Sequence, residues 1–597
     1  MQNNEENKPV TSLIPEAEEP PTISGDEADV VVTEELAMDS APPASQSAPQ
    51  EHQNFFKKWG SLLVLGLALA IIVIDTTLLN VSIGTIIKEL HTDIQSIQWI
   101  ITAYSLTLVA LTITGGRLGD LFGRKRMFML GAILFAVGSF IASISTNFPT
   151  LLIGESIVEG IGAALMMPAT SSLLVANFKG KDRALAFGVW GGIAGASAAI
   201  GPILGGWLTK NYSWRWGFRI NIVVTLILLV GSILVKESRD DKEKPTLDIL
   251  GVFLSATGLL AIVFGIIESS TYGWWKPKEI VLLFGQQMLI GGISFVPFII
   301  LFGLLVLWGF VQWEQIIERR GETPLVSMGI FANRTFTAGV TTMAMVAMGQ
   351  VGLIFAMPVF LQSVLKLDAL GTGLALLPLS ISLLIMAPVS AMMTRKFAPR
   401  YIIITGLALG IVAQLVLWAS ISAEATVWSL APGLALAGAG MGIAMAQISN
   451  ITLSSVPVYQ AGEASGINNT SRQLGSTLGS AIIGAVLLSA LTTNLSSGIR
   501  DSAVIPESAK SSIINTVSQQ SSNVEFGGGS QATSQLPPAV SAEIELIGKN
   551  ASVAASQEAY LFGAIFAALG FLVAHTLPTV KAQGKDQKPR DIPAAGH

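Results

Sequence analysis

Fourteen long apolar runs follow one another along the sequence, and this succession limits the fold more than any other feature. A helix of about 20 apolar residues crosses the ~30 Å hydrocarbon core of a bilayer. Only 13% of the residues are charged, against about 25% in a typical soluble domain. We therefore predict an all-α membrane protein with fourteen transmembrane helices. The runs cover residues 59–81, 96–114, 127–146, 151–176, 184–208, 218–235, 247–267, 291–313, 335–364, 370–394, 401–421, 427–453, 468–491 and 558–578.

The runs divide into groups of six, two and six. Residues 1–54 hold twelve acidic residues and one lysine with no apolar periodicity, which is typical of a disordered tail. We expect an interfacial helix at 279–290 and a short helix at 540–549 in a partly flexible loop. The predicted domains are a disordered acidic cytoplasmic tail (1–54), a six-helix bundle (55–237), a charged loop with two extra helices (238–320), a second six-helix bundle with a long external loop at 492–557 (321–580) and a cytoplasmic tail (581–597).

Basic residues gather in alternate connections between the runs, which predicts the orientation in the membrane. They occur at residues 57–58, 117–126, 179–183, 236–244, 319–320, 395–400 and 581–590. Loops rich in Lys and Arg lie on the cytoplasmic side. We therefore predict that both termini are cytoplasmic. We also expect the protein to reside in the plasma membrane, the inner membrane of a bacterium.

The composition argues against several classes of function. The chain has no cysteine and only four histidines, none paired at metal-ligand spacing, so we expect no disulfide, metal centre or other cofactor. No phosphate-binding loop is present, which argues against an ATP-driven pump or another enzyme with catalytic residues. No basic soluble domain that could bind nucleic acid is present.

The expected partners are the bilayer, protons and a small molecule. We expect a monomer and leave open an accessory efflux partner.

A short basic connection joins the second and third runs, from Gly115 to Arg126. Its one acid, Asp120, can pair with a nearby Arg or sit at the positive N-terminus of another helix. The bland alternative is a basic cytoplasmic turn with no further role. The spacing of Gly, Asp and basic residues resembles the loop 2–3 motif of the major facilitator superfamily. That resemblance implies two six-helix bundles, here with two helices inserted, and a conformational latch at Gly116, Asp120, Gly123, Arg124 and Lys125.

Asp75 is an acid within the first apolar run. An ionised Asp at a helix centre costs about 2.5–3.5 kcal/mol even on the lenient insertion scale, so it is expected to face the interior and to have a function. The alternatives are an acid that reaches the surface or one that caps a broken helix. The segment resembles the first-helix motif of the drug:proton antiporters, with Asp75, Thr76, Thr77 and Asn80 in matching places. This resemblance implies a role for Asp75 in proton coupling.

Glu155 and Glu159 lie four residues apart in the fourth run, which places them on one helix face. Two nearby carboxylates repel and can share one proton, so they form a candidate proton or substrate site. Alternatively, both reach water near the outer surface. The family pattern has an Arg where this chain has Ser156. Acids without an adjacent cation indicate cationic cargo or a rearranged proton path.

The fifth run contains the sequence Gly-Pro-Ile-Leu-Gly-Gly. Small residues at i, i+4 form a close-packing face, and packing alone would explain the glycines. The stretch also resembles the antiporter motif of proton-driven exporters. The matching residues are Gly195, Gly201, Pro202, Gly205 and Gly206.

Arg472, in the eleventh of the twelve bundle helices, is either an inner-surface charge or a residue facing the cavity, where it would belong to the substrate or proton site. The resemblance to the fourteen-helix drug:proton antiporters covers residues 55–495 and 555–580. It implies proton-coupled export of amphipathic, cationic drugs or toxic compounds by alternating access. The alternatives are export of one metabolite, such as a siderophore, amino acid or lipid, and a membrane sensor or scaffold that uses the acidic tail.

Overall fold

The helices of this computed structural model follow the apolar runs of the sequence. The structure describes residues 55–92, 94–238, 246–277, 282–283, 286–287, 292–514 and 537–579; the two predicted tails lie outside these residues. Thirteen of the described helices are long and apolar enough to cross a membrane, and the shorter apolar helix Leu377–Met393 occupies the remaining predicted run. The predicted all-α membrane fold is confirmed, and the helices are compatible with fourteen crossings.

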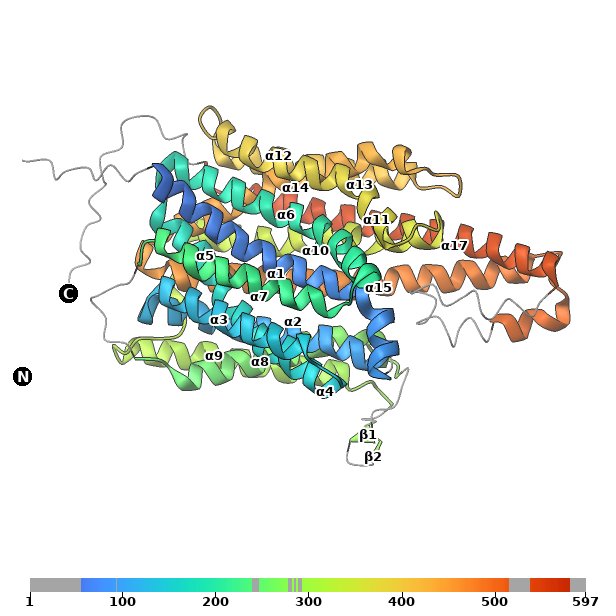
Figure 1. The fold of residues 1–597 in the computed structure, drawn as a ribbon, viewed down its shortest axis with the longest axis horizontal. Helices are drawn as coiled ribbons and strands as arrows, with labels where there is room; N and C mark the ends of the chain where they lie inside the picture. The colour runs from blue at the N-terminus through green and yellow to red at the C-terminus, as the bar shows by residue number, and fades with distance from the viewer. Residues whose placement is uncertain are drawn as a thin grey trace, which may run out of the picture. The chain divides into compact units, whose positions relative to one another are not determined.

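The described part of the first half contains seven α-helices and a π-helix, η1. Figure 1 labels helices α1 to α7. Their bounds are α1 (Phe55–Leu90), α2 (Ile94–Phe122), α3 (Arg124–Ser143), α4 (Phe148–Leu151), η1 (Leu152–Glu159), α5 (Gly160–Asn177), α6 (Gly180–Asn211), α7 (Arg215–Gly231) and the 3-10 turn η2 (Ser232–Leu234). Together α4, η1 and α5 form the fourth predicted run.

The rest of the chain begins with a helix pair and continues with the second bundle. The bounds are α8 (Ile249–Tyr272), β1 (Leu282–Leu283), β2 (Gln286–Gln287), α9 (Val296–Arg319), η3 (Met328–Ala332), α10 (Arg334–Ser363), α11 (Ala369–Ala375), α12 (Leu377–Met393), α13 (Pro399–Ser420), α14 (Val427–Ser454), η4 (Val458–Gln460), α15 (Ala461–Asp501) and α17 (Pro538–Ala574). Strands β1 and β2 pair antiparallel, with Leu282 opposite Gln287.

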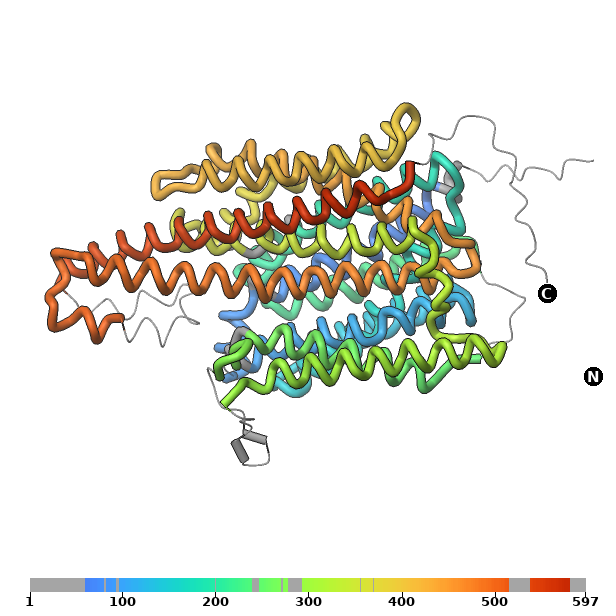
Figure 2. Tube along the Cα trace, turned by 180° about the vertical axis from the view of Figure 1, so that it is seen from behind, coloured from blue at the N-terminus to red at the C-terminus, as the bar shows by residue number. Residues whose placement is uncertain are grey.

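Two expectations about the connections are wrong. Residues 282–283 and 286–287 form the β1–β2 pair instead of part of an interfacial helix. The segment 492–557 is mostly helical where it is described, because α15 continues to Asp501 and α17 already begins at Pro538. These extensions bury Leu495, Ile499, Val540 and Ile547 in one apolar cluster, which stabilises helices that the sequence presents as a polar loop. Figure 2 shows the end of α15 and the start of α17 reaching beyond the other helices.

The apolar core is divided between the two halves of the chain. Helix α1 packs on α6 and α7, and α3 packs on α5 and α7, whereas α14 packs on α12 and α13, and α10 and α15 pack on α17. The α8–α9 pair lies against α2 and α15. The halves meet where α2 and α5 contact α15 and where α6 contacts α12 and α14. Several large apolar side chains of α9 face outward, as expected of a lipid-facing surface; they include Leu301, Phe302, Leu305 and Trp308.

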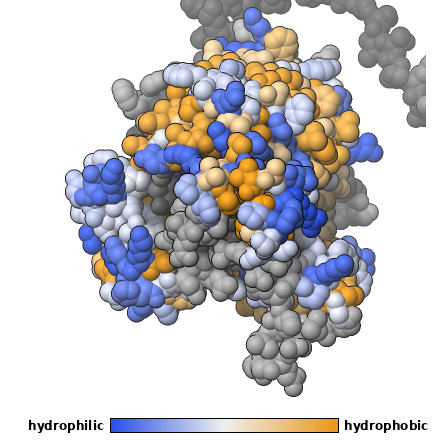
Figure 3. Space-filling model, turned by 90° about the vertical axis from the view of Figure 1, so that its right-hand side faces the viewer, coloured by the Kyte–Doolittle hydropathy of each residue, from blue (hydrophilic) through white to orange (hydrophobic). Residues whose placement is uncertain are grey.

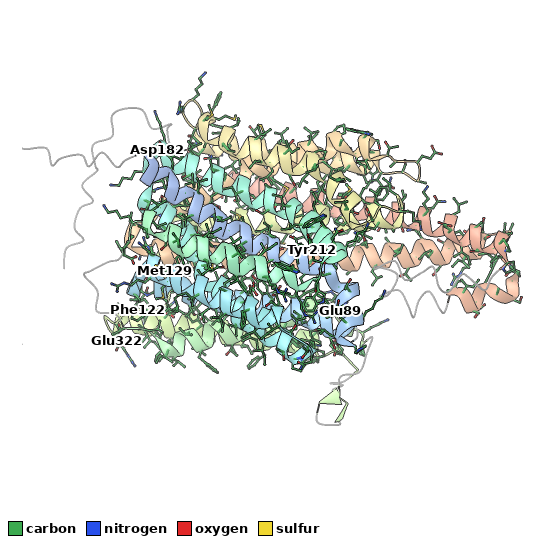
Figure 4. All side chains as sticks on the ribbon, viewed as in Figure 1. Glu89, Phe122, Met129, Asp182, Tyr212 and Glu322 are labelled. Atoms are coloured by element: carbon green, nitrogen blue, oxygen red, sulfur yellow. The ribbon has the colours of Figure 1, made fainter. Side chains whose placement is uncertain are left out.

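The helix ends lie at two opposite faces, which the sequence predicts to be cytoplasmic and external. Phe122, Asp182 and Glu322 lie at one end, called here the predicted inner end, and Glu89 and Tyr212 lie at the other, the predicted outer end (Figure 4). Figure 3 looks onto the predicted outer end, where hydrophilic residues lie among apolar ones. The alternation of the connections between these two ends agrees with the charge pattern.

Candidate functional site

Three acids from separate parts of the first half form one buried cluster. Asp75 comes from α1, and Glu155 and Glu159 come from η1. Their side chains are 2%, 1% and 0% exposed. One carboxylate oxygen from each acid lies within 4.8 Å of the others. The structure therefore brings together all three acids that the sequence singled out, and it encloses the two glutamates instead of letting them reach water.

Neutral side chains supply the hydrogen bonds to this cluster. Asn221 Nδ2 donates to Asp75 Oδ1 at 2.6 Å and to Glu159 Oε1 at 3.1 Å. Ser139 Oγ donates to the same Glu159 oxygen at 2.8 Å. The second oxygens of Asp75, Glu155 and Glu159 are buried without a hydrogen-bond partner. Among the described residues, none of the three acids forms an ion pair with Lys or Arg.

Local helix geometry delivers the glutamates to this position. Residues 152–159 form a π-helix, a variant that occurs frequently at functional sites. Gly138 on α3 lets the two helices approach, because an added Cβ at Gly138 would lie 2.7 Å from Glu159 Cβ. Ser156 is completely buried, and its hydroxyl donates to the carbonyl oxygen of Ile100 at 2.7 Å. Ser156 therefore joins η1 to α2 at the position where the family pattern has an Arg.

Electrostatics limits the charge that the cluster can carry. Two unit charges 4 Å apart repel by about 4 kcal/mol at an effective dielectric of ~20. Three ionised carboxylates at this spacing would add three such repulsions to the cost of burial. The cluster can therefore hold protons, shared between the acids. The same oxygens could instead hold a hard cation such as Na⁺ or Ca²⁺. The absence of a metal site therefore stays a prediction.

The predicted antiporter motif lies on α6, beside the turn of α1 that carries Asp75. An added Cβ at Gly201 would meet Thr77 Cβ at 2.9 Å, and one at Gly205 would meet Leu78 Cα at 3.1 Å. Gly195 instead faces Leu383 on α12. Pro202 and Gly206 lie on the same helix and are partly exposed. Helix α6 therefore touches both α1, which carries Asp75, and the second half of the chain. The side chain of Asn80, which the sequence also matched to the family, lies outside the described residues.

Asp120 joins the two halves at the predicted inner end. Its Oδ1 accepts hydrogen bonds from Arg124 Nε and Nη2 at 3.0 and 2.7 Å and from the backbone N–H of Gly462 at 3.0 Å. Its Oδ2 accepts from the backbone N–H of Glu463 at 2.8 Å. These two N–H groups belong to the first turn of α15, where a helix favours negative charge. Both partners that the sequence offered to Asp120 are present together.

The rest of the Gly116–Lys125 segment contributes close packing and further bonds. Gly116 lies against the carbonyl oxygen of Gly462, where a side chain would not fit. Gly123 adopts φ 106°, a conformation that favours glycine. Arg124 also donates to Ser238 Oγ at 3.1 Å and to the carbonyl oxygen of Val458. Lys125 takes part through its backbone N–H, which donates to Glu237 at 2.9 Å.

Arg472 does not lie at the predicted inner surface. It is eleven residues from the start of α15, which corresponds to about 16 Å along the helix. Its Nη2 lies 3.9 Å from Met167 Sδ on α5. The guanidinium therefore points from the second half of the chain toward the first half, far along α15 from the Asp120 contacts.

Sequence reasoning missed several polar residues that complete these sites. Asn221 and Ser139 link the acids, and Glu463 accepts a hydrogen bond from the backbone N–H of Ser327 at 2.7 Å. Ser139 and Asn221 are polar residues inside apolar runs, and this signal could have identified them. Glu463 gave no such signal because the predicted run begins only at residue 468.

Comparisons with known proteins agree with this architecture. A family model of the Major Facilitator Superfamily matches residues 65–480. The xylose symporter XylE has the same fold, with a TM-score of 0.54 at 12% identity, covering 88% of this chain and 97% of that one. The human organic anion transporter MFSD10 also has a TM-score of 0.54, at 11% identity, covering 87% of this chain and 99% of its own.

Three relatives show the same family by sequence. A probable actinorhodin transporter of Streptomyces coelicolor is 30% identical, covering 75% of this chain and 76% of the relative. The tetracenomycin C resistance and export protein of Streptomyces glaucescens is 27% identical, covering 72% and 76%. The multidrug efflux pump LfrA of Mycolicibacterium smegmatis is 28% identical, covering 75% and 85%. The chain therefore belongs to the Major Facilitator Superfamily and is a multi-pass membrane transporter of small molecules, not an enzyme.

Proposed function

We propose that the protein exports amphipathic drugs or toxic compounds from a bacterial cell in exchange for protons, by alternating access. It would reside in the plasma membrane, with both termini in the cytoplasm. The relatives named for drug resistance and export support the direction and the type of cargo. The buried cluster of Asp75, Glu155 and Glu159 supports proton coupling. Among the described residues no Lys or Arg pairs with these acids, so bound protons would have to neutralise them while they are buried.

The proposed cycle links the acid cluster to movement of the two halves. A proton entering from the outside would reduce the negative charge of the cluster by one, and its release to the inside would complete the exchange. A charge crossing the membrane gains about 2.3 kcal/mol per 100 mV. Asp120 would hold the predicted inner end closed in one state through Arg124 and the start of α15. Proton binding then biases the equilibrium between two conformations.

The Asp75→Asn variant provides the main test. Asparagine has a similar shape but cannot carry a proton, so exchange through Asp75 should stop while the fold remains. We expect proton-driven efflux to fall to the level of empty vesicles. The measurement is dye export and proton flux in vesicles reconstituted with the purified protein under an imposed pH gradient.

A matched control uses a second acid within a membrane helix. Glu268 lies on α8, outside the cluster, and is partly exposed, so Glu268→Gln should leave coupling intact. Undiminished proton-driven export by Asp75→Asn would contradict the proposal. Export that follows a sodium gradient and ignores a pH gradient would assign the cluster to a metal cation instead.

A second candidate is export of one defined metabolite. The observation that favours it is the naming of two relatives after single compounds, actinorhodin and tetracenomycin C. A panel of structurally unrelated toxic compounds, applied to cells with and without the protein, separates the two. Resistance to many of them supports multidrug export, whereas resistance to one compound supports the second candidate. The preference for cationic cargo stays a prediction. The acids that suggested it are buried within the first half, so their burial gives no support for direct contact with the cargo.

A further inference from the structure

Among the described residues, no oxygen atom accepts a hydrogen bond from Arg472, unlike Arg124 and Arg183. Arg124 donates to Asp120, Ser238 and Val458, and Arg183 donates to Phe178, Ser454 and Val175. Among the described residues, Arg472 reaches only the Met167 sulfur, at 3.9 Å. A thioether is a weak acceptor, whereas a guanidinium has five N–H donors. The described residues therefore leave most N–H groups of Arg472 available to another molecule.

The surroundings of Arg472 on α15 are polar and open progressively toward the predicted outer end. Asn468, one turn before Arg472, is 5% exposed, and its Oδ1 has no partner. Arg472 and Ser476 are partly exposed, and Ser480 is exposed. Residues four apart lie on neighbouring positions of one helix face. A molecule that approaches along this face from the predicted outer end would therefore reach Arg472 before the closed contacts around Asp120.

Arg472 lies against the apolar core of the first half through Met167. Met167 belongs to the apolar cluster of the first half, which also contains Phe187. Trp190 on α6 packs against that cluster and meets Phe187 edge-on, with ring centroids 6.1 Å apart. The Trp190 indole N–H has no hydrogen-bond partner. A guanidinium that lies against an apolar side chain is suited to an amphipathic molecule that carries a negative group.

We infer that Arg472 binds the carboxylate or phenolate of the exported molecule, so that the preferred cargo is an amphipathic organic acid. This inference rests on the proposed export function and replaces its expectation of cationic cargo. The three acids do not oppose it, because they are enclosed by helices of the first half. A guanidinium favours oxygen anions through two parallel, charge-assisted hydrogen bonds.

Two dyes that share a xanthene ring test the charge preference. Fluorescein carries carboxylate and phenolate groups, and rhodamine 6G is a cation. Binding of each dye to the purified full-length protein is measured by fluorescence anisotropy, for wild type, Arg472→Gln and Arg472→Lys. We expect Arg472→Gln to weaken fluorescein binding about tenfold or more, the value of a lost charge-assisted hydrogen bond. Arg472→Lys should lose less, and rhodamine 6G binding should not weaken.

The control variant is Arg219→Gln, which removes an exposed cation that lies over the Trp216 ring; it should leave the binding of both dyes unchanged. Equal weakening of both dyes by Arg472→Gln, or unchanged fluorescein binding, would overturn the inference. Vesicle transport separates it from the proposed function. Proton-driven export of rhodamine 6G without binding of fluorescein refutes only the role of Arg472. Binding of fluorescein through Arg472 without any gradient-driven export refutes only the export proposal.

Discussion

Single residues determine how each buried charge of this protein is balanced. Asp120 is paired with Arg124 and accepts two N–H groups of α15. Among the described residues, the acids around Asp75 have only neutral hydrogen-bond donors, and Ser156 stands where the family pattern has an Arg. A fixed guanidinium would neutralise one carboxylate permanently. In the proposed exchange, a mobile proton would supply this positive charge instead.

A surface ion pair at the predicted outer end provides a prediction about pH. Glu89 Oε2 accepts hydrogen bonds from Arg215 Nη1 at 2.5 Å and from Trp214 Nε1 at 3.0 Å. Partial burial raises the pKa of Glu89, but the bonds from Arg215 and Trp214 outweigh it and hold the pKa below its ordinary value of 4.5. A carboxylate with a lowered pKa stabilises the fold above the unfolded-state pKa and loses this effect as pH falls.

Glu89→Gln should therefore lower the melting temperature slightly at pH 7, and the difference from wild type should shrink as pH falls below 4.5 and vanish below the lowered pKa of the folded state. The side chain is 42% exposed, so the effect stays below about 1 kcal/mol. Thermal unfolding of the purified protein across this pH range measures it. The control is Glu545→Gln, in the more exposed pair with Lys366, which should change the melting temperature at pH 7 less than Glu89→Gln does. A constant difference between Glu89→Gln and wild type at all pH values would contradict the assignment.

At the scale of elements, the sequence was most informative where one apolar run makes one helix. The run at 184–208 becomes α6, and the run at 335–364 becomes α10 almost residue for residue. It was least informative where helix stability comes from a partner. The end of α15 is rich in Ser and Thr, and the start of α17 contains several polar and charged residues. Both segments are helical because each buries apolar residues against the other.

The contact between α1 and α6 gives a prediction about packing. An added Cβ at Gly201 would lie 2.9 Å from Thr77 Cβ and 3.1 Å from the carbonyl oxygen of Ile74. Gly201→Ala should therefore displace the turn of α1 that carries Asp75. Overpacking of this kind costs about 1–3 kcal/mol. Thermal unfolding should show the loss of stability, and vesicle assays should show impaired proton coupling.

The matched control for Gly201→Ala is Gly410→Ala on α13. An added Cβ at Gly410 meets nothing within 4 Å, and alanine favours a helix over glycine by about 1 kcal/mol. The control should therefore leave stability unchanged or raise it. Equal stability of Gly201→Ala and wild type would show that α1 and α6 are not in close contact in the working protein.

For the whole molecule, the sequence could identify the parts of the site but not how they assemble. Asp75 and Glu159 are 84 residues apart, and no local pattern shows that their carboxylates meet. The pairing depends on Asn221 of a third helix and on the π-helical turn before Glu159. The same holds for Asp120, whose partners on α15 lie more than 340 residues later in the chain.

The contact of Asp120 with α15 carries the last prediction, which concerns the movement of the two halves. Asp120→Asn removes the charge that pairs with buried Arg124, and breaking a buried pair costs about 3–5 kcal/mol. A change of this size can reverse a two-state population, so the predicted inner end should open more often.

The chain has no cysteine, so spin labels can be attached at Phe122→Cys and Tyr459→Cys, which are both exposed at this end. Electron paramagnetic resonance then measures the distance between the two labels. Longer distances should gain population in Asp120→Asn but not in Glu322→Gln, which changes an exposed acid at the same end. An unchanged distance distribution would show that Asp120 does not hold the halves together.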